Sequence, residues 1–425
     1  MPKIRLEPVR GMRDLIPPES EEILWLEDTF RKRASSYGYE PVILPTVELF
    51  KLFEVKSGPE IVRSMYVFKD KAGREVCLRP ELTAGAARLF LKTLQTRPRP
   101  VKIYYVGHVY RYEEPQRGRY REFIQAGVEY FGEEGVGADI ELLALVRDYL
   151  ADIGLKHYRL KLGHMGILRT LLNSWSVPED VQDEAIHLID KGLVDDAVRL
   201  LQKHAAGNDV SIVKELPKCR EGDPEKLVRC GEEVGVSGAA LDYVRQLSKI
   251  LGVARELGIN DVYADLGFAR GLAYYTGFIF EIESSALGLS VGGGGRYDTL
   301  ISLYGGPSTP ATGFALGVDR IHLALKEEGW RIPERAVKVL LIPLVENYAY
   351  VDRIASRLRE DGAIVNVYPK PKVSAGLRYA SSRGYDYAVI VGEREVREGT
   401  VTVKNLRTRR QAVVSVDSLS LGGLP

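Results

Sequence analysis

The spacing of hydrophobic residues changes several times along the chain, and each change predicts a different kind of element. Residues 17–40 carry apolar side chains at helical spacing and the pattern stops at Gly38, so this segment is predicted to be an amphipathic helix. Its buried face is expected to consist of Ile23, Leu26, Phe30 and Ala34. The next segment, EPVILPTVEL, has the composition of a strand, and its Pro45 favours a sheet edge or a subunit contact.

From about residue 60 to 132, short β-like runs alternate with one helical segment, ELTAGAARLFLKTL, and the short connections favour antiparallel pairing. From about 165 to 258 the apolar residues return to helical spacing, which predicts a helical insertion. Strand-like sequence resumes at VYADLGFARGLAYYTGFIFEIES and LSVGGGGRYD, followed by a helix near ATGFALGVDRI. The β-rich part is therefore predicted to be split in two by the insertion.

Beyond a linker-like stretch, EEGWRIPERA, strand and helix patterns alternate in VKVLLIPL, YVDRIASRLREDG, AIVNVYP, AGLRYASSRG and DYAVIVG. Such alternation is typical of a small α/β domain with a largely parallel sheet. We therefore expect an α+β domain on an antiparallel sheet, formed by residues 1–164 and 259–327 and interrupted by a helical insertion at 165–258. A linker at 328–336 then leads to an α/β domain at 337–425.

Composition narrows the class of protein without assigning a function. A chain of 425 residues with 45% hydrophobic residues can form two or three domains. Its net charge of +1 does not by itself indicate a protein that binds nucleic acid or membranes. Cys77, Cys219 and Cys230 form no CxxC pair and are odd in number, which argues against a zinc site and a disulfide framework and favours a reducing, cytoplasmic location. No apolar run approaches the roughly 18 residues that would span a bilayer, so no membrane contact is expected.

Polar residues occupy every second position of two successive strand-like segments, although half of each strand should face a core. Successive strand side chains point to opposite faces, so one face of the second segment consists of Gln125, Gly127 and Glu129. Its other face, the predicted core face, consists of Ile124, Ala126, Val128 and Tyr130. The polar face of the first segment consists of Tyr105, Gly107, Arg111 and Glu113. Paired as a hairpin, the two segments gather cations, carboxylates and an amide on one surface.

Two interpretations of this surface are open: a solvated outer face crossed by salt bridges, or the floor of a pocket. Gly107 and Gly127 weaken their strands, as expected where a ligand must approach the backbone. The segment YYTGFIFEIE has the same alternation of a polar, glycine-containing face with an apolar face. Its polar face consists of Tyr275, Gly277 and Glu281. Three such strands favour a pocket on an antiparallel sheet. The glycine run at 292–295 lacks the phosphate-loop pattern GxxxxGK[ST] and is expected to form a tight bend.

The segment YVGHVYRYEEPQRGRYREFIQAGVEYFG, which contains both polar strands, resembles motif 2 of the class II aminoacyl-tRNA synthetases, in the form of the histidyl-tRNA synthetase family. ATGFALGVDRI is similar to motif 3, and EPVILPTVEL to motif 1, the dimer-forming segment. ARGLAYYTGFIFE resembles the histidine-specific motif, and LRPELTAGAAR the LRPE-x-T segment. GMRDLIPPE and VTVKNLRTRRQ extend the resemblance over nearly the whole chain. Three positions depart from the family pattern: Ala273, Glu114 and Ile124.

The resemblance implies a class II synthetase-like catalytic domain, an anticodon-binding domain, and ATP-dependent attachment of histidine to its tRNA through a histidyl-adenylate. Fixed guanidinium groups suit this reaction, because a carboxylate and an α-phosphate must be held together while charge develops. By resemblance, Arg111 and Arg270 are catalytic, and ATP is bound by Arg111, Glu113 and Arg320. The implied histidine-binding residues are Glu81, Thr83, Arg111, Gln125, Glu129, Arg270, Tyr274 and Tyr275.

ATP is implied as a substrate, with Mg²⁺ on its phosphates and no structural metal bound by the protein. Two stretches carry a local basic excess in a nearly neutral chain, +6 over 368–411 and +5 over 96–121. Such patches indicate a polyanion held at two places. The expected partners are histidine tRNA, L-histidine, ATP and a second copy of this chain through the motif 1 region.

Two alternatives stay open. One is the catalytically silent paralogue that regulates ATP phosphoribosyltransferase, a binding protein that characteristically lacks the anticodon-type domain and loses catalytic motif residues. This chain has the domain pattern and keeps the motif arginines. The other alternative is a synthetase of the related subclass for another amino acid, against which RGLAYYTG argues.

Overall fold

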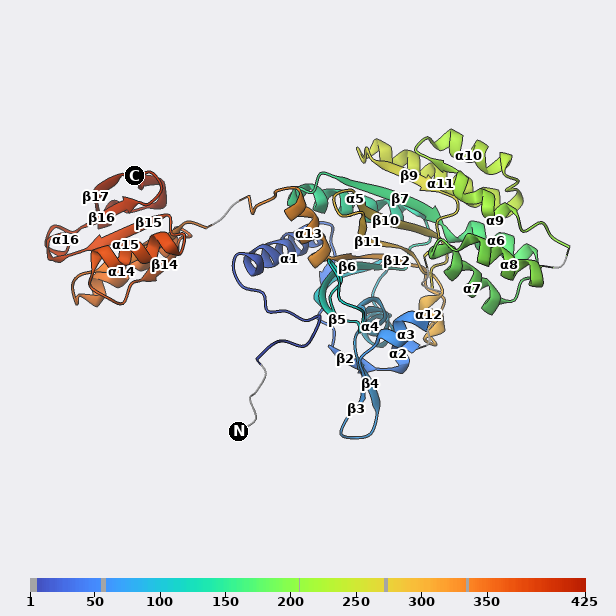
Figure 1. Cartoon of the computed structure of the whole chain (residues 1–425), viewed down its shortest axis with the longest axis horizontal. Helices are drawn as coiled ribbons and strands as arrows, with labels where there is room; N and C mark the ends of the chain where they lie inside the picture. Colours follow the sequence, from blue (N-terminus) through green and yellow to red (C-terminus); the bar gives the residue numbers. More distant parts are fainter. Residues whose placement is uncertain (1–5, 55–58, 206, 271–273, 334–335) are drawn as a thin grey trace. The chain divides into compact units, whose positions relative to one another are not determined.

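The computed structural model describes residues 6–54, 59–205, 207–270, 274–333 and 336–425. The chain divides into two compact units, Met1–Arg331 and Ile332–Pro425, and each is described by itself (Figure 1). Within the described residues, no helix combines the length and the apolar character needed to cross a membrane.

A nine-stranded sheet forms the centre of the first unit, in the order β1-β5-β6-β12-β11-β10-β7-β9-β8. Its strands are β1 (Glu40–Pro41), β5 (Val101–Tyr110), β6 (Glu122–Phe131), β7 (Tyr158–His164), β8 (Arg220–Glu221), β9 (Val262–Asp265), β10 (Phe278–Ser284), β11 (Leu289–Arg296) and β12 (Ala311–Gly317). Neighbours pair antiparallel except β1 with β5 and β7 with β9. The predicted fold class, an antiparallel sheet interrupted by a helical insertion, is confirmed.

The predicted hairpin of polar strands is the β5–β6 pair, in which Tyr105 lies opposite Gly127 and Gly107 opposite Gln125. The predicted core face of β6 is at most 9% exposed and consists of Ile124, Ala126, Val128 and Tyr130. A register shift of one residue would exchange the two faces of the strand, so the buried face fixes the pairing.

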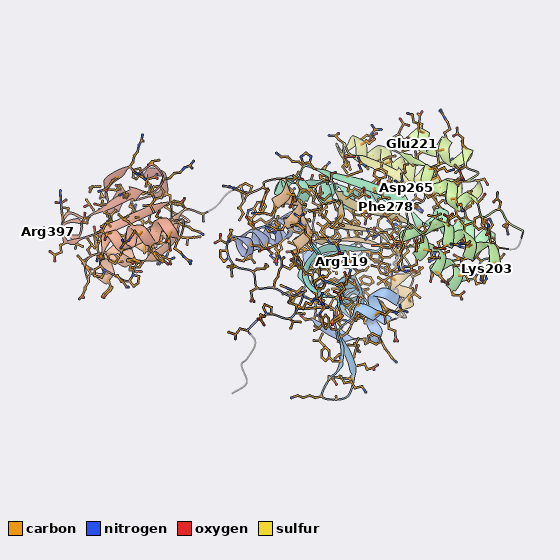
Figure 2. The ribbon with its side chains drawn as sticks, in the orientation of Figure 1. Arg119, Lys203, Glu221, Asp265, Phe278 and Arg397 are labelled. Atoms are coloured by element: carbon orange, nitrogen blue, oxygen red, sulfur yellow. A yellow bond between two sulfur atoms is a disulfide. The ribbon has the colours of Figure 1, made fainter. Side chains whose placement is uncertain are left out.

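Three helices pack against the sheet: α1 (Glu19–Ser36), α5 (Val136–Ile153) and α13 (Val318–Glu327). Helix α1 also packs against the other two. The predicted apolar face of α1 is buried, and the Phe30 ring meets Tyr149 of α5 and Phe314 of β12 edge-on. Figure 2 labels Phe278 of β10, which is also fully buried among the packed side chains. Burial of one such side chain contributes about 1.5–3 kcal/mol, so the core holds the sheet in place.

A small sheet of order β2-β4-β3 lies in the same unit, formed by β2 (Val47–Leu49), β3 (Val67–Lys69) and β4 (Glu75–Leu78). The short helices that accompany the two sheets are α2 (Lys51–Glu54), α3 (Pro59–Ser64), α4 (Thr83–Leu89), continued by the π-helix η1 (Phe90–Leu94), and α12 (Leu300–Leu303). EPVILPTVEL was expected to be one strand, but it forms β1 and β2 with an irregular stretch between them. Its two ends pair with different sheets, and Pro45 cannot donate to a ladder.

The expected tight bend at the glycine run is wrong, because 292–295 lie inside strand β11 and pair with β10 and β12. The strands approach so closely that a Cβ at Gly294 would lie 2.1 Å from the carbonyl oxygen of Gly313. The glycines therefore allow close packing of neighbouring backbone rather than a change of chain direction.

The insertion is helical and contains α6 (Met165–Ser174), α7 (Glu179–Asp190), α8 (Val194–His204), α9 (Ile212–Glu215), η2 (Leu216–Lys218), α10 (Pro224–Glu233) and α11 (Gly238–Glu256). Cys219 and Cys230 form a disulfide, so the inference that the cysteines argue against a disulfide is wrong. Their separation matches no motif, and only the fold brings β8 and α10 together. Disulfides also occur in intracellular proteins of hyperthermophiles, so the bond does not define a compartment.

The second unit contains a five-stranded sheet of order β14-β13-β15-β16-β17. Its elements are β13 (Lys338–Pro343), α14 (Tyr348–Glu360), β14 (Ile364–Val367), α15 (Val373–Ser382), β15 (Tyr387–Val391), α16 (Glu393–Glu398), β16 (Thr400–Asn405), β17 (Gln411–Ser415), η3 (Val416–Ser418) and η4 (Leu421–Gly423). The predicted strand-helix alternation is confirmed through β15. The sheet is parallel only in β14-β13-β15, because β16 and β17 add an antiparallel edge that was not predicted.

Candidate active site

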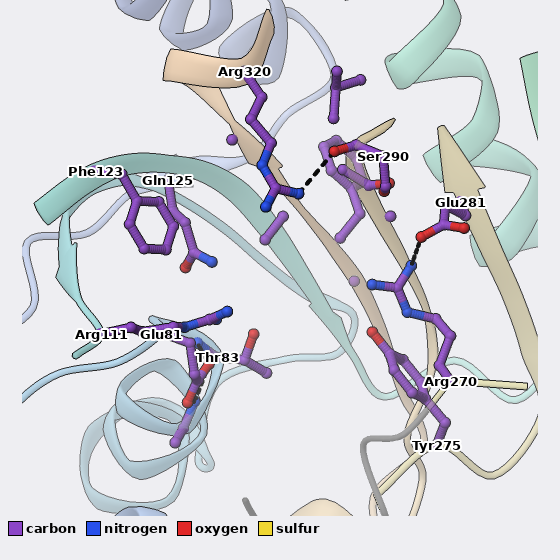
Figure 3. Close-up of a pocket in the computed structure, with 18 of the residues that line it drawn as sticks. Glu81, Thr83, Arg111, Phe123, Gln125, Arg270, Tyr275, Glu281, Ser290 and Arg320 are labelled. Atoms are coloured by element: carbon purple, nitrogen blue, oxygen red, sulfur yellow. Dashed lines mark hydrogen bonds and ion pairs between the residues drawn. The ribbon is translucent and has the colours of Figure 1, made fainter. Parts of the chain in front are cut away.

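A cavity of about 390 Å³ opens on the polar face of the central sheet. All ten residues implied by the resemblance line it: Glu81, Thr83, Arg111, Glu113, Gln125, Glu129, Arg270, Tyr274, Tyr275 and Arg320. In Figure 3 the guanidinium groups of Arg111, Arg270 and Arg320 reach toward one space from different sides. The polar faces of β6 and β10, together with Arg111 directly after β5, therefore line a pocket rather than an open solvated surface.

Glu129 is the most deeply buried carboxylate of the cavity and is 1% exposed. Its Oε1 accepts a hydrogen bond from the Tyr105 hydroxyl over 2.8 Å, and its Oε2 accepts one from the Tyr297 hydroxyl. Burial raises the pKa of Glu129 to about 8, although both hydrogen bonds favour the ionised form. A Cβ at Gly313 would lie 2.1 Å from Oε2, so the neighbouring strand leaves room for this carboxylate only with glycine there.

Glu81 lies at the start of α4, where its carboxylate accepts hydrogen bonds from the backbone N–H groups of Thr83 and Ala84 over 2.5 and 3.0 Å. A helix N-terminus favours negative charge, but burial dominates and raises the pKa of Glu81. The Thr83 hydroxyl lies 3.4 Å from that of Tyr105. Polar groups thus run along one wall of the cavity from Glu81 to Glu129.

Arg111 follows the last residue of β5 and is anchored by its Nε, which donates to the Pro80 carbonyl over 2.9 Å. Its guanidinium lies 5.4 Å from the centre of the Phe123 ring. Burial lowers the pKa of Arg111, since the charged form is removed from water. The anchor uses only Nε and leaves the rest of the guanidinium available to an anionic ligand. Binding of such a ligand would offset the free-energy cost of burying the Arg111 charge.

Arg320 enters from the first turn of α13. Its Nε donates to the Gly118 carbonyl and its Nη1 to the Ser290 carbonyl, each over 2.9 Å (Figure 3). Burial is the main reason that its pKa is lowered. The preceding residue, Asp319, accepts a hydrogen bond from the Ile124 backbone N–H over 2.7 Å.

Arg270 approaches from the opposite wall, where its Nη1 donates to the Phe280 carbonyl over 3.1 Å and lies 3.9 Å from Oε1 of Glu281. Burial alone would lower the pKa of Arg270, but the electrostatic effect of Tyr275 and Glu281 outweighs it and raises the pKa. A Cβ at Gly293 would lie 2.1 Å from Nη1. The glycine run therefore clears the path on which this side chain crosses the sheet.

Gln125 brings an unsatisfied acceptor to the cavity, because its buried Oε1 has no hydrogen-bond partner within the part of the chain that the structure describes. A buried acceptor without a donor costs about 1–3 kcal/mol, so it calls for a donor on a ligand. The rings of Tyr274 and Tyr275 lie 4.9 Å apart between centres, with their planes tilted by 49°, and both line the cavity. The carboxylate of Glu113, which also lines the cavity, lies 3.1 Å from the Nε of Arg119.

Among the residues of the cavity wall that sequence reasoning missed are Tyr297, Arg119, His187 and Asp190. Tyr297 follows the glycine run, which has no side-chain alternation from which a face could be assigned. His187 and Asp190 belong to α7 of the insertion, and their i, i+3 spacing places them on one helix face.

The three departures from the family pattern lie in different environments. Glu114 pairs with Arg10 at the surface over 2.9 Å, Ile124 is buried, and Ala273 lies outside the described residues.

Residues 11–321 match the family model described as histidyl-tRNA synthetase, and residues 338–420 match the anticodon binding domain. The histidine–tRNA ligase of Saccharolobus solfataricus is 39% identical over 98% of both chains. The apo histidyl-tRNA synthetase of S. aureus superposes with a TM-score of 0.69 at 26% identity, covering 97% of this chain and 98% of that one. A protein of Bacillus halodurans described as an ATP phosphoribosyltransferase regulatory subunit/histidyl-tRNA synthetase has a TM-score of 0.76 at 24% identity, covering 91% and 98%.

The antiparallel sheet and its arginine-lined cavity are those of a class II aminoacyl-tRNA synthetase catalytic domain. The family match over most of the chain and the identity of its relatives go further: the chain belongs to the histidyl-tRNA synthetase family. At 24% identity, the likeness to the Bacillus protein shows the fold alone.

Proposed function

We propose that this protein activates L-histidine with ATP and transfers it through a histidyl-adenylate to histidine tRNA, releasing AMP and pyrophosphate. Family membership supports the reaction class. The observation that carries the proposal is the convergence of Arg111, Arg270 and Arg320 on a cavity that also buries Glu81 and Glu129. Three cations suit the anionic reactants, and two carboxylates suit the ammonium group of an amino acid.

In the first step, a carboxylate oxygen of histidine bonds to the α-phosphorus of ATP, and the bond from this phosphorus to pyrophosphate breaks. Arg111 holds the α-phosphate and the substrate carboxylate, and Arg270 acts from the opposite wall as negative charge grows on the phosphoryl oxygens. Both are anchored by backbone carbonyls, those of Pro80 and Phe280. Such fixed donors need little reorganisation in the transition state, and this is the main source of their effect.

ATP is held at the other end of the cavity. Arg320 stacks on adenine and reaches the γ-phosphate, and Glu113 accepts a hydrogen bond from the adenine amino group. Mg²⁺ would neutralise phosphate charge. The wall offers Glu113 and Glu281 as oxygen donors, which fits an ion held chiefly by phosphates and water rather than by a protein cage.

Histidine recognition uses the polar wall formed by Glu81, Thr83, Gln125, Glu129, Tyr274 and Tyr275. The ammonium group and both ring nitrogens of histidine need partners, because a buried imidazole without them is costly. Phenylalanine and glutamine leave these wall groups unpaired, so each is expected to be rejected by a factor of roughly 10⁴ without editing.

The decisive experiment is ATP–pyrophosphate exchange measured with each amino acid in turn, followed by charging of tRNA. Exchange with histidine alone is expected. Exchange that is as fast with another amino acid contradicts the specificity of the pocket, and histidine binding without exchange favours the regulatory alternative. The retained Arg111, Glu113, Arg270 and Arg320, together with the second unit, support the enzyme.

We further propose catalytic parts at 1–164 and 259–327, an insertion at 165–258, a linker at 328–336 and an anticodon-binding domain at 337–425, in a cytoplasmic homodimer. The motif 1 region supports a dimer because exposed apolar side chains gather there, with Ile43 fully exposed and Leu49 55% exposed. Sedimentation of the wild type and of Ile43→Glu tests this assembly, and only the variant is expected to sediment as a monomer.

A further inference from the structure

The segment Gly11–Arg13 lies against the outer side of the motif 2 loop, defined here as residues 113–121. The Gly11 carbonyl accepts a hydrogen bond from the Arg121 backbone N–H over 2.8 Å. Gly11 has a φ of +84°, and a Cβ there would lie 2.8 Å from Cγ of Arg121. Only glycine combines this backbone conformation with so close an approach.

Arg13 connects this loop to the motif 3 helix α13. Its guanidinium lies 3.9 Å from the centre of the Tyr120 ring. Its Nη2 pairs with Oδ1 of Asp319 at 2.5 Å, and its Nη1 pairs with Oε1 of Glu19 at 2.7 Å. One planar cation therefore contacts the loop through an aromatic face and the helix through a carboxylate.

Asp319 extends the link into the catalytic sheet. It is 6% exposed, and its second oxygen accepts the Ile124 backbone N–H of β6 over 2.7 Å. The next residue in the helix, Arg320, donates to the Gly118 carbonyl of the loop. A displaced Asp319 would thus move both Arg320 and the start of β6.

The loop end is fixed by a second arginine. Arg121 is 5% exposed, lies 3.8 Å from the centre of the Tyr112 ring, and donates from Nε to the Glu113 carbonyl over 3.0 Å. Its own carbonyl accepts the backbone N–H of Arg111 over 2.9 Å. Arg111 and Glu113 are the two proposed ATP ligands in motif 2. Both are therefore hydrogen-bonded through their backbone to Arg121, the residue that Gly11 holds.

Arg13 itself does not line the active-site cavity. It lines a second cavity behind it, and Tyr120 and Asp319 belong to the walls of both. These two residues are the partition between the cavities, and Arg13 contacts both from the rear. It can therefore act on bound ATP only through the partition.

We propose that Arg13 is a positioning residue for ATP: it fixes the motif 2 loop and the motif 3 helix in the relative placement that ATP requires. This inference rests on the proposed function for its role in catalysis. Histidine is proposed to bind on the opposite wall, around Glu81, Glu129 and Tyr275, and none of these residues contacts Arg13. Loss of Arg13 should therefore affect the two substrates unequally.

The test compares Arg13→Ala, Arg13→Lys and a matched control, Arg10→Ala. Arg10 also pairs with the motif 2 loop, through Glu114 over 2.9 Å, but the two side chains are 72% and 80% exposed, and such pairs contribute little. Arg13→Ala is expected to weaken ATP binding and raise the KM for ATP about tenfold or more, with the KM for histidine within about twofold. Lysine keeps the charge but loses the planar stack, so Arg13→Lys should recover part of the loss. Arg10→Ala should match the wild type.

ATP affinity is measured by calorimetry and both KM values by exchange, with a melting curve for each variant. A lower Tm with unchanged ATP affinity assigns Arg13 a purely structural role and overturns the inference, as does an equal rise of both KM values. If the wild type binds ATP but exchanges it with no amino acid, the proposed function fails, and the calorimetric comparison still decides the role of Arg13.

Discussion

Tyr105 and Glu129 face each other across the β5–β6 pair, and the tyrosine hydroxyl donates to the carboxylate over 2.8 Å. Because Glu129 is buried, its pKa rises from an ordinary value of 4.5 to about 8. The carboxyl proton of Glu129 is thus bound more tightly in the folded protein than in the unfolded chain. The contribution of Glu129 to stability is fully present below pH 4.5 and is lost as the pH rises through 8.

We therefore expect Glu129→Gln, which keeps the shape and carries no titratable proton, to stabilise the protein relative to the wild type as the pH rises from 5 to 8. The difference should change by a few kcal/mol, since each pKa unit corresponds to about 1.4 kcal/mol. Urea unfolding of both proteins across this range gives the measurement. A difference that is constant with pH would show that Glu129 is ionised in the folded protein throughout.

A second expectation concerns Arg270 and the glycine beneath it. Arg270→Ala should abolish adenylate formation while leaving the fold and most histidine binding intact, because its charge acts mainly as the transition state develops. The cost should be on the order of 3 kcal/mol or more. Single-turnover adenylation and equilibrium histidine binding separate the two effects. A variant with near-native single-turnover adenylation would remove Arg270 from the catalytic role.

Gly293→Ala should reproduce much of that loss without removing any charged group. The added Cβ would lie 2.1 Å from Nη1 of Arg270 and 2.5 Å from the Phe280 carbonyl oxygen, so the guanidinium must move. Misplacement of a reacting group by about 1 Å can cost about 100-fold in rate. Gly137→Ala is the matched control, because a Cβ there meets nothing within 4 Å. Native exchange by Gly293→Ala would mean that Arg270 acts from another position.

The disulfide between Cys219 and Cys230 provides a third expectation. It closes a short loop next to the strand that leads to Arg270, since the Leu266 backbone N–H donates to the Cys219 carbonyl over 3.1 Å. Loss of the bond should lower the free energy of unfolding by roughly 3 kcal/mol. Unfolded, non-reduced protein should titrate one thiol, that of Cys77, and reduced protein three. Equal melting curves for the wild type and Cys230→Ser would show that the bond does not stabilise the fold.

The sequence predicted the elements whose side chains alternate or recur. The period of two in β6 separated Gln125 and Glu129 from the core face, and the period of 3.6 in α1 identified its buried stripe. These patterns suffice because burial of one face fixes both the element and its register. The candidate residues of the cavity came from the family resemblance, and the fold brings them together although they span positions 81 to 320.

Other features were not accessible because no local sequence pattern encodes them. A run of glycines has no side-chain period, so nothing distinguished a strand from a bend at 292–295. The pairing of Cys219 with Cys230 depends on the approach of β8 to α10. Arg13 belongs to a motif noticed in the sequence, but its role depends on Tyr120 and Asp319, and no local pattern connects these three residues.

A fourth expectation concerns the second unit, Ile332–Pro425, with its basic excess. A chain that ends at Arg331 should retain adenylate formation if its dimer persists, because every proposed ligand of ATP and histidine precedes that point. Charging of tRNA should collapse through weaker tRNA binding. The full-length protein should lose tRNA affinity more steeply with salt, because it neutralises more phosphates and releases more counterions. Equal affinities and equal salt slopes would show that this unit does not hold tRNA.

The fifth expectation places part of that tRNA contact on three tyrosines. The rings of Tyr368 and Tyr379 lie 5.4 Å apart, and those of Tyr379 and Tyr385 lie 6.1 Å apart. Basic residues lie between these tyrosines in the sequence, at Lys370, Lys372, Arg378 and Arg383. Unpaired bases stack on such aromatic platforms at about 1–3 kcal/mol per base, and cations hold the adjoining phosphates.

Tyr379 is 39% exposed, so Tyr379→Ala removes a stacking surface without opening the core. We expect a five- to hundredfold loss of tRNA affinity by the stacking energy above, about 1–3 kcal/mol, with a nearly unchanged salt slope, since no phosphate contact is lost. Tyr348→Ala is the matched control, because Tyr348 is 76% exposed in the same unit and lies outside the three-tyrosine cluster. Filter binding across a salt series measures both quantities. Equal losses of tRNA affinity in the two variants, or no loss in either, would place the tRNA bases elsewhere. A changed salt slope in Tyr379→Ala would mean that the variant disturbs the neighbouring basic residues.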